Sequence, residues 1–418
     1  MSSPTSSDVE RITTKCCIVG GGPAGMMLGF LLARAGIDAV VLEKHGDFLR
    51  DFRGDTIHPS TLQVMHELGL LEEFLKRPHN EVRQLDAQIG DELITIADFS
   101  HLPTVCKFIA FMPQWDFLNF VAEHGKRYPT FHLMMETEGL DLIDEQGRVV
   151  GVRARNSHGP LEIRAGLVVA TDGRHSTMRA RAGFEVIDLG APMDVLWMRI
   201  SRKPSDPGQT FGHVEAGRFL ILLDRDDYWQ CAFVIRKDSF EEYKRRGLEA
   251  FHREIVELAP YLEDRVGELT DWKQISLLSV KVDRLRTWCC AGLLCIGDSA
   301  HAMSPIGGVG INLALQDAIA AANLLAPRLR TGGANLHALR EVQRRREFPT
   351  RMIQGLQIFI QNRFISPVLS GNQRLQTPLL ARLTRRWPIL RRIPARVIGM
   401  GFRPEHIHTP EASPAHDS

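Results

Sequence analysis

Apolar and polar positions at the start of the chain follow the pattern of a strand, a helix and a second strand. Positions 13–19 are β-branched and cysteine-rich, which predicts a short buried strand. An apolar helix follows Gly25 and ends at Gly36, a residue that can adopt the left-handed conformation of a helix C-cap. Positions 37–42 predict a second strand that ends at Glu43. This order predicts a βαβ unit with a parallel sheet.

The turn between the first strand and the helix has the pattern G-x-G-x-x-G at positions 20–25. Gly20 allows the tight turn, Gly22 lets the backbone approach a pyrophosphate, and Gly25 lets the helix pack close to the sheet. The helix N-terminus offers free N–H groups and a positive dipole end to phosphates. Glu43 follows the second strand, where a carboxylate can accept hydrogen bonds from ribose hydroxyls. Together these features predict a dinucleotide site rather than a chance glycine-rich turn.

Two helices are predicted between this unit and residue 126. One starts at Pro59 and ends at Gly69, and the other covers positions 111–126 with Gln114 in its first turn. Arg53 precedes the first of these helices. It is either a surface charge or a residue near the phosphates or ring of a cofactor.

An Asp-Gly pair follows the next group of predicted strands, which cover 149–155, 161–163 and 167–170. Asp172 and Gly173 come directly after the last strand and precede a helix that carries Arg179 and other basic residues. A purely structural interpretation of Asp172 is a capping carboxylate in an ordinary strand-to-helix turn.

The pattern changes between residues 194 and 282. Strand-like stretches separated by Pro, Gly and Asp-Asp turns predict an antiparallel sheet, and therefore a second domain. The predicted elements are strands at 195–200, 219–223, 229–235 and 277–282, with a helix at 241–258. Positions 91–99 are expected to join this sheet, so the second domain would be assembled from two insertions in the first.

A second glycine-rich loop follows a buried strand predicted at 293–296, which ends in Gly297 and Asp298. Asp298 at the end of a strand can bind a ribityl or ribose hydroxyl. The loop leads into a long apolar helix, so backbone N–H groups and the positive helix end can face an electron-rich group. A flavin needs this arrangement, because its reduced ring carries negative charge at the pyrimidine edge. His301 lies beside the loop, where a structural role is favoured over an acid–base role.

The region from 340 to 418 is helical in pattern and rich in arginine. Its arginines at 379–402 alternate with apolar residues, so this face could lie on an anionic bilayer. Pro388 and Pro394 divide the pattern, which favours a solvent-facing cap on the domain instead. Residues 1–12 lack the apolar core of a signal peptide, and no apolar run approaches the length of a membrane span. We therefore expect a cytoplasmic protein, with peripheral contact to the inner face of the membrane as the alternative.

Composition and charge argue against some classes of function. The chain of 418 residues is long enough for two domains, and its formal net charge of +1 gives no global field that would attract nucleic acid. Seven cysteines without zinc spacing predict reduced thiols and no metal site.

The stretches around residues 20, 172 and 298 together resemble the flavin-dependent aromatic hydroxylases of the para-hydroxybenzoate hydroxylase fold, a superfamily that includes the ubiquinone-biosynthesis hydroxylases. The resemblance implies an α/β fold, in which a Rossmann-like FAD-binding domain carries an inserted, mainly antiparallel substrate domain and C-terminal helices. The expected parts are 13–80, 101–190 and 285–340 for FAD binding, 81–100 and 191–284 for the substrate domain, and 341–418 for the helices.

The same resemblance implies the site residues. Gly20, Gly22 and Gly25 would hold the FAD pyrophosphate, Glu43 the adenosine ribose and Asp298 the ribityl chain. The other expected FAD contacts are Ala24, Lys44, Arg53, Gln114, Asp172, Gly173, Arg179, Pro305, Gly308, Gly310, Ile311 and Asn312. Pro305, Gly307 and His58 are the expected catalytic positions. His58, His213 and Tyr228 are candidates for a general base, each equally consistent with a structural role.

The reaction implied by the resemblance is hydroxylation of a small aromatic or polyketide-like substrate by a flavin hydroperoxide, formed from FAD, NAD(P)H and dioxygen. A second G-x-G-x-x-G is absent, so the nicotinamide would bind only transiently. The alternatives are a membrane-associated hydroxylase of a prenylated quinone precursor, a flavin-dependent reductase of prenyl double bonds, and a flavin-binding protein without turnover. A monomer and a homodimer are both consistent with the sequence.

Overall fold

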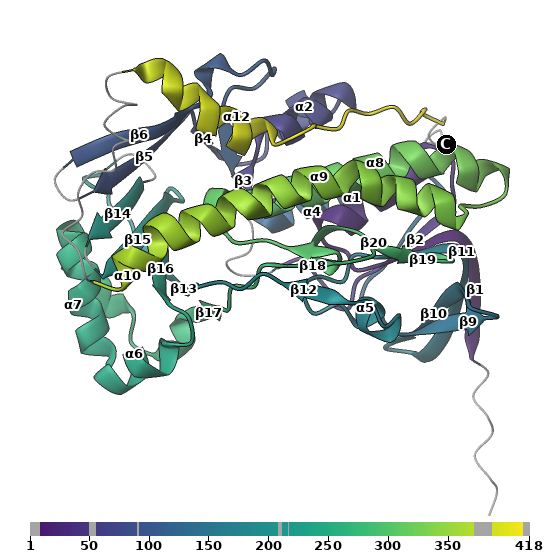
Figure 1. The fold of residues 1–418 in the computed structure, drawn as a ribbon, viewed down its shortest axis with the longest axis horizontal. Helices are drawn as coiled ribbons and strands as arrows, with labels where there is room; N and C mark the ends of the chain where they lie inside the picture. Colours follow the sequence, from purple (N-terminus) through teal and green to yellow (C-terminus); the bar gives the residue numbers. More distant parts are fainter. Residues whose placement is uncertain are drawn as a thin grey trace, which may run out of the picture.

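The larger sheet of this computed structural model carries the N-terminal βαβ unit (Figure 1). The structure describes residues 9–49, 56–89, 92–207, 211–215, 217–371 and 387–412. Five parallel strands lie side by side in the order β20 (Leu293–Cys295), β11 (Gly159–Ala170), β1 (Glu10–Val19), β2 (Ala39–Leu42) and β8 (Phe131–Met134). Antiparallel strands β19 (Cys289–Cys290), β10 (Arg148–Asn156) and β9 (Glu138–Glu145) complete the sheet. The parallel sheet predicted from the sequence is confirmed.

Helices cover one face of this sheet. Helix α1 (Pro23–Arg34) packs between α4 (Gln114–Gly125) and α8 (Gly310–Thr331), and α9 (Leu336–Ile360) packs against α8. Ten of the twelve residues of α1 are buried, which explains why its sequence is apolar on all sides. Gly29 allows the close approach, since a Cβ there would lie 2.5 Å from Cγ2 of Val41 on β2.

A second, seven-stranded sheet forms the expected inserted domain. Its order is β17 (Ser276–Leu278), β13 (Met193–Ser201), β16 (Tyr228–Arg236), β15 (Arg218–Asp224), β14 (Phe211–Glu215), β5 (Gln84–Ile89) and β6 (Glu92–Asp98). The expectation that positions 91–99 join this sheet is confirmed. The helix predicted at 241–258 is two helices, α6 (Phe240–Arg246) and α7 (Leu248–Leu258), because Gly247 adopts a φ of +87° between them. The strand predicted at 277–282 is the shorter β17.

The two faces of the second sheet have different neighbours. Apolar side chains such as Leu220 and Phe233 pack against α7 on the outer face. On the inner face, Ile221 and Leu223 pack with Phe111 and Met400, which belong to the rest of the molecule. The inner face is therefore the one that can contribute to a site between the two sheets.

Two small sheets and three short helices join these parts. One sheet is β3 (Thr56–Ile57), β7 (Ile109–Phe111) and β4 (Asn80–Val82), and the other is β12 (Val186–Asp188), β18 (Asp283–Leu285) and β21 (His301–Ala302). The helices are α2 (Pro59–Glu67), α3 (Leu71–Phe74) and α5 (Thr177–Arg181). The predicted start of α2 at Pro59 is confirmed, and Gly69 follows its end with a φ of +73°.

The C-terminal region is mainly helical up to Met400 in its described residues, whereas residues 401–412 form no helix, contrary to the expected helical pattern. A π-helical turn at Gln361–Ile365 continues α9 into α10 (Ser366–Leu369), and a 3₁₀ turn at Pro388–Arg391 precedes α12 (Arg392–Met400). The chain then runs back to the first domain, where the N–H of Ala412 donates to the carbonyl oxygen of Arg34 at 2.7 Å. Arg382, Arg385 and Arg386 of the arginine-rich pattern lie outside the described residues.

One helical segment in the described part of the chain, Ile306–Thr331, has the length and composition of a membrane span. The sequence expectation missed it because Asn312, Gln316 and Asp317 interrupt its apolar run. Since 83% of its most apolar window is buried inside the protein, the segment is accounted for as a core helix.

Candidate cofactor and active site

Four predicted groups lie at the carboxyl ends of adjacent parallel strands. The glycine-rich turn follows β1, Glu43 follows β2, Asp172 follows β11, and Asp298 lies in the 3₁₀ turn after β20. The carboxyl ends of neighbouring parallel strands meet at one edge of a sheet, where ligands of such folds bind. The fold therefore gathers the three sequence motifs at one place.

The glycine-rich turn leaves space in front of α1. A Cβ at Gly20 would lie 2.5 Å from the carbonyl oxygen of Thr171, and a Cβ at Gly25 would collide with the carbonyl oxygen of Gly20. By contrast, a Cβ at Gly22 would meet nothing within 4 Å. Helix α1 has no side-chain cap and no acidic residue in its first turn, so its first N–H groups can bind an anion. This arrangement fits the pyrophosphate of a dinucleotide.

Glu43 is held in place by backbone donors. Its Oε2 accepts from the N–H of Gly21 and its Oε1 from the N–H of His45, both at 3.1 Å. A carboxylate held in this position at the end of β2 can accept a hydrogen bond from a ribose hydroxyl. Gly21 was missed by the sequence analysis, although a Cβ at this position would lie 2.8 Å from Cβ of Glu43. Its place as the middle residue of the glycine triplet 20–22 could have indicated this close contact.

Asp172 accepts a hydrogen bond from the first turn of α5 and has a second carboxylate oxygen that is buried. Its Oδ2 accepts from the N–H of Met178 at 3.1 Å, while Ser176 is the N-cap of α5. The other oxygen, Oδ1, is buried without a hydrogen-bond partner in the described residues. Burial raises the pKa of Asp172, against hydrogen bonds that lower it. A buried acceptor of this kind fits a hydroxyl donor of a bound cofactor.

Arg179 forms an internal ion pair. Its Nη1 lies 3.3 Å from Oδ1 of Asp283 and donates to the carbonyl oxygen of Ser299 at 3.4 Å. The arginine thus joins α5 to β18 and to the turn that carries Asp298. Contact between Arg179 and FAD stays a prediction.

Asp298 lies beside the glycine-rich turn. A Cβ at Gly297 would lie 3.2 Å from Cβ of Ala24, so the two loops are in contact. The Asp298 side chain is partly exposed, with Oδ2 at 3.7 Å from Nη2 of Arg174. It is therefore open to a ligand hydroxyl.

The loop from Pro305 to Gly310 is held by residues near α2. Gly307 and Gly308 adopt φ values of +77° and +63°. Thr56 donates its hydroxyl to the carbonyl oxygen of Gly308 at 2.9 Å. Nε2 of His58 lies 3.0 Å from the same oxygen, and its Nδ1 lies 2.7 Å from the carbonyl oxygen of Ile398.

These contacts bear on the role of His58. The side chain is fully buried, and burial lowers its pKa despite the two carbonyl oxygens, which raise it. Because both ring nitrogens face backbone carbonyls, neither is directed at a substrate. The geometry favours a structural role for His58, and its catalytic role stays an unsupported prediction.

The N-terminus of α8 is joined to α2. The hydroxyls of Ser60 and Thr61 each donate to Oδ1 of Asn312 at 2.8 Å. Helix α8 begins at Gly310 without a side-chain cap or an acidic residue in its first turn. Its positive end therefore remains available to an electron-rich group. Ile311 is buried beside Asn312 on this first turn.

A buried charge network supports the same region. Nε2 of His301 lies 2.6 Å from Oδ2 of Asp317, which also accepts from the N–H of Gly297 at 3.1 Å. Arg346 donates from Nε to Asp317 Oδ1 at 2.9 Å and lies 3.4 Å from Glu405. Burial raises the pKa of Asp317, but His301 and Arg346 outweigh it and hold the pKa below its ordinary value. The structural interpretation of His301 is favoured, because it is almost fully buried in this network.

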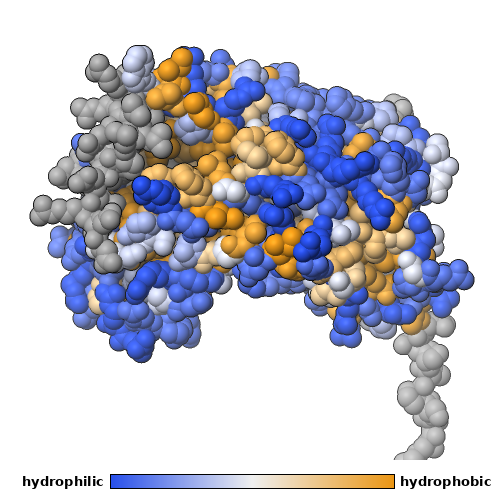
Figure 2. All heavy atoms as spheres, in the orientation of Figure 1, coloured by the Kyte–Doolittle hydropathy of each residue, from blue (hydrophilic) through white to orange (hydrophobic). Residues whose placement is uncertain are grey.

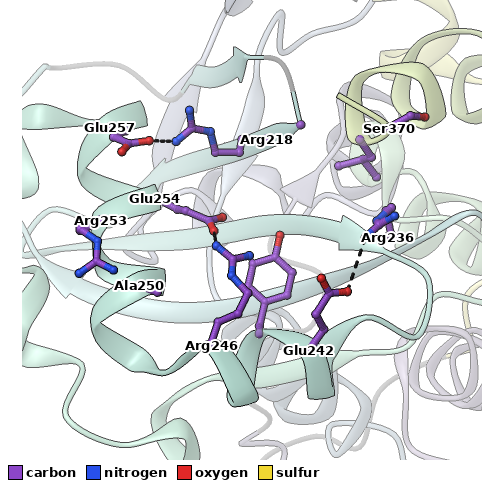
Figure 3. Close-up of a pocket in the computed structure, with 12 residues that line it drawn as sticks. Arg218, Arg236, Glu242, Arg246, Ala250, Arg253, Glu254, Glu257 and Ser370 are labelled. Atoms are coloured by element: carbon purple, nitrogen blue, oxygen red, sulfur yellow. Dashed lines mark hydrogen bonds and ion pairs between the residues drawn. The ribbon is translucent and has the colours of Figure 1, made fainter. Parts of the chain in front are cut away.

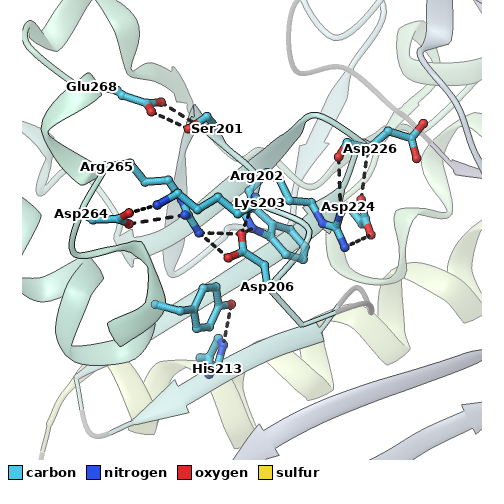
Figure 4. A network of polar contacts seen from close by, with 12 residues as sticks. Ser201, Arg202, Lys203, Asp206, His213, Asp224, Asp226, Asp264, Arg265 and Glu268 are labelled. Atoms are coloured by element: carbon cyan, nitrogen blue, oxygen red, sulfur yellow. Dashed lines mark hydrogen bonds and ion pairs between the residues drawn. The ribbon is translucent and has the colours of Figure 1, made fainter.

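Two other general-base candidates lie on the second sheet. His213 pairs with Leu220 and so faces α7, where its Nε2 lies 3.5 Å from the hydroxyl of Tyr261 (Figure 4). Burial lowers the pKa of His213 to about 4. Tyr228 lies under the guanidinium of Arg199 at 4.9 Å. His213 is therefore on the wrong face of the sheet for a base at the cofactor edge.

The polar network around His213 is structural. Asp206 accepts from Nε1 of Trp229 at 2.8 Å and pairs with Arg265 at 2.5 Å, which ties the 201–207 loop to the outer face (Figure 4). A pocket of about 510 Å³ lies on this domain too, between α6, α7 and β15–β16 (Figure 3). Arg236 points at Glu242 across 3.5 Å there, and further arginine–glutamate pairs line the wall. The pocket is not part of the cofactor edge.

Three other residues were predicted to contact FAD. Gln114 is the first residue of α4 and is half-buried, as the predicted helix implied. Lys44 is exposed. Arg53 lies outside the described residues.

Known proteins that resemble this chain are FAD-binding proteins and monooxygenases. Residues 13–355 match the family model described as "FAD binding domain". The 6-methylpretetramide 4-monooxygenase of Streptomyces rimosus is 30% identical over 387 residues, which are 92% of either chain. The para-nitrophenol 4-monooxygenase of Pseudomonas sp. (strain WBC-3) is 26% identical over 324 residues, covering 76% of this chain and 79% of the relative.

Solved structures share the fold. PqsL, a probable FAD-dependent monooxygenase from Pseudomonas aeruginosa, superposes with a TM-score of 0.71 at 22% identity, covering 86% of this chain and 99% of its own. The OxyS anhydrotetracycline hydroxylase from Streptomyces rimosus gives a TM-score of 0.73 at 20% identity, covering 93% and 76%.

Proposed function

We propose that this chain hydroxylates a small aromatic or polyketide-like compound with NAD(P)H and dioxygen. The chain belongs to the family of FAD-dependent aromatic monooxygenases. FAD is the cofactor of this family, and the protein is an oxidoreductase. The observation that carries the proposal is the convergence of the glycine-rich turn, Glu43, Asp172 and Asp298 at one sheet edge. The relatives do not favour a prenyl reductase or a quinone-precursor hydroxylase.

The proposed roles follow from the geometry. The open space at Gly22 and the first N–H groups of α1 would receive the pyrophosphate, and Glu43 the adenosine ribose. Asp298 would accept from a ribityl hydroxyl. Oδ1 of Asp172 supplies a further buried acceptor. Bound FAD would supply the redox chemistry, by taking a hydride from the nicotinamide and activating dioxygen.

The chain's own contribution to the reaction is positioning. The Pro305–Gly310 loop presents backbone groups held by Thr56 and His58, and the positive end of α8 lies directly behind it. Both would stabilise negative charge that develops during the reaction. The inner face of the second sheet would hold the substrate and exclude water. Trp197 and Ile221 give it an apolar surface that suits an aromatic ring system.

A polyketide-like substrate is supported by the first relative, whose name gives 6-methylpretetramide as its substrate. Its similarity covers 92% of both chains. We propose a cytoplasmic enzyme, which is consistent with relatives of this class.

The test uses the purified protein with its bound flavin. NADPH and NADH are offered separately with a panel of aromatic polyketides, under isotopically labelled dioxygen. We expect substrate-stimulated nicotinamide oxidation and a product that gains one labelled oxygen atom. Asp298→Asn should weaken FAD binding, whereas Asp188→Asn, an exposed aspartate on β12, should not. Flavin that neither nicotinamide reduces, with any substrate, would contradict the proposal.

A further inference from the structure

Helix α9 carries an exposed apolar stripe. Phe348, Met352, Leu356 and Phe359 follow helical spacing and are 43%, 41%, 38% and 55% exposed. A different face of α9 is buried and includes Ile353. The stripe is therefore additional to the face that stabilises the fold.

The exposed side of the turn before α12, together with α12 itself, continues this apolar surface. Trp387, Ile389 and Ile393 are 57%, 60% and 63% exposed. Helix α12 packs beside α9, because Val397 and Phe402 contact the buried cluster that contains Ile353. The guanidinium of Arg403 also lies 4.3 Å from the ring centre of Phe348. Figure 2 shows hydrophobic side chains over both elements on one face of the molecule. We call this surface the α9–α12 face.

The charge around the α9–α12 face is positive. Its exposed arginines are Arg344, Arg351, Arg363, Arg392, Arg396 and Arg403. In the described residues of these elements, the acidic side chains are Glu341, Glu347 and Glu405, and each is buried or half-buried and paired with an arginine. The neighbouring strand β6 adds Glu92 and Asp98, which leaves a positive excess.

We propose that the α9–α12 face docks on an anionic phospholipid bilayer. Exposed aromatic and aliphatic side chains can enter the interfacial layer, while the surrounding arginines bind lipid phosphates. A second copy of the chain fits less well, because a two-fold pairing would place this arginine rim opposite itself. The docking does not depend on the proposed reaction.

Docking would also bring the candidate active site to the membrane. Ile306 of the Pro305–Gly310 loop packs in one cluster with Ile360 and Ile365, which follow the apolar stripe along the chain. A Cβ at Gly307 would lie 3.9 Å from Cγ1 of Ile398 on α12. The loop is thus directly supported by the elements that form the α9–α12 face.

The experiment is co-flotation of the flavin-loaded protein with lipid vesicles. We expect binding to vesicles that contain roughly one third phosphatidylglycerol, little binding to pure phosphatidylcholine, and release as salt rises from about 0.1 M to about 0.5 M. The double variant Arg392→Gln/Arg396→Gln should lower the partition coefficient roughly 30-fold, at about fivefold per arginine. Phe359→Ser with Ile393→Ser should also lower it.

The matched control is Arg148→Gln/Arg155→Gln, which removes the same charge from exposed positions of β10. It should bind vesicles like the unaltered protein. Flavin content and thermal unfolding check that every variant is folded. Failure of the unaltered protein to float with anionic vesicles would overturn the proposal, and so would an equal loss in the control. Sedimentation that shows a dimer, abolished by Phe359→Ser/Ile393→Ser, would assign the face to self-association instead.

Discussion

Single atoms decide what the glycine-rich turn can do. The backbone of Gly25 touches Gly20 so closely that a side chain has no room, whereas Gly22 borders open space. The same chemical change therefore has different consequences three residues apart. At this scale the structure separates Gly25, where a side chain cannot be accommodated, from Gly22, which we propose faces the pyrophosphate.

We expect Gly25→Ala to destabilise the protein by about 1–3 kcal/mol, because the new methyl group collides with the backbone. Gly22→Ala should leave unfolding nearly unchanged and instead weaken FAD binding, since its methyl group occupies the space for the pyrophosphate. Urea unfolding of the apoprotein and FAD titration measure the two effects. Equal stability loss in both variants would contradict this distinction.

The buried His213 makes stability depend on pH. Its pKa is lowered to about 4 in the folded state from an ordinary 6.5. Between these values the unfolded chain binds more protons than the folded one, so this group makes stability rise with pH through the window. Replacing His213 with Asn should flatten the slope of unfolding free energy between pH 4 and 6.5. Denaturant titrations across that window test it, and an unchanged slope would show that other groups dominate.

Elements far apart in the chain converge on the loop from Pro305 to Gly310. Strand β3 contributes Thr56 and the residue before α2 contributes His58, which both contact the carbonyl oxygen of Gly308. Helix α12 acts through His58, because the carbonyl oxygen of Ile398 holds the other ring nitrogen. The loop's conformation therefore depends on three elements outside it. None of these partners was recognised from the sequence, because they lie at separations of about 250 to 340 residues.

Thr56→Val removes the hydroxyl that donates to Gly308 while keeping the side-chain shape. We expect a loss of about 1 kcal/mol in stability, typical of one hydrogen bond. If the proposed reaction is correct, the looser loop should also admit water and raise the hydrogen peroxide released per nicotinamide oxidised. Thr56→Ser, which keeps the donor, is the control. Unchanged peroxide release in Thr56→Val would argue that the loop does not exclude water.

At the scale of the whole molecule, a chain of charges joins α8, α9 and the C-terminal segment. Asp317 pairs with Arg346, which pairs with Glu405, and exposed Arg345 reaches the same glutamate at 2.7 Å. The C-terminal segment is thereby held against the two core helices. The network also supports the turn of Asp298, through the N–H of Gly297.

Replacing the neighbouring arginines Arg346 and Arg345 should lower the stability of the protein by very different amounts. Arg346→Gln should cost about 3–5 kcal/mol, because it removes the fully buried positive charge that bridges Asp317 and Glu405. Asp317 then keeps only His301, and Glu405 only Arg345, as a charged partner. Arg345→Gln should cost no more than about 1 kcal/mol, since its side chain is half exposed. Thermal and urea unfolding compare them. Similar losses would mean that the network contributes little to stability.

The sequence alone determined the features that depend on contiguous residues. The glycine-rich turn with its helix, the Asp-Gly pair and the aspartate after a buried strand could be recognised because their chemistry requires fixed residues at short spacing. The alternation of the second domain likewise identified strands β6, β13, β15, β16 and β17, but it did not single out β5 or β14.

Only the tertiary structure decided which distant groups meet. His58 was a candidate base until the fold placed carbonyl oxygens at both of its nitrogens. His213 faces α7 because of its strand register, and a shift of one residue would have reversed its direction. Arg346 shows the same dependence, since its burial against Asp317 and Glu405 leaves no mark in the local pattern. Long-range packing sets these partners, and a local sequence pattern carries no record of it.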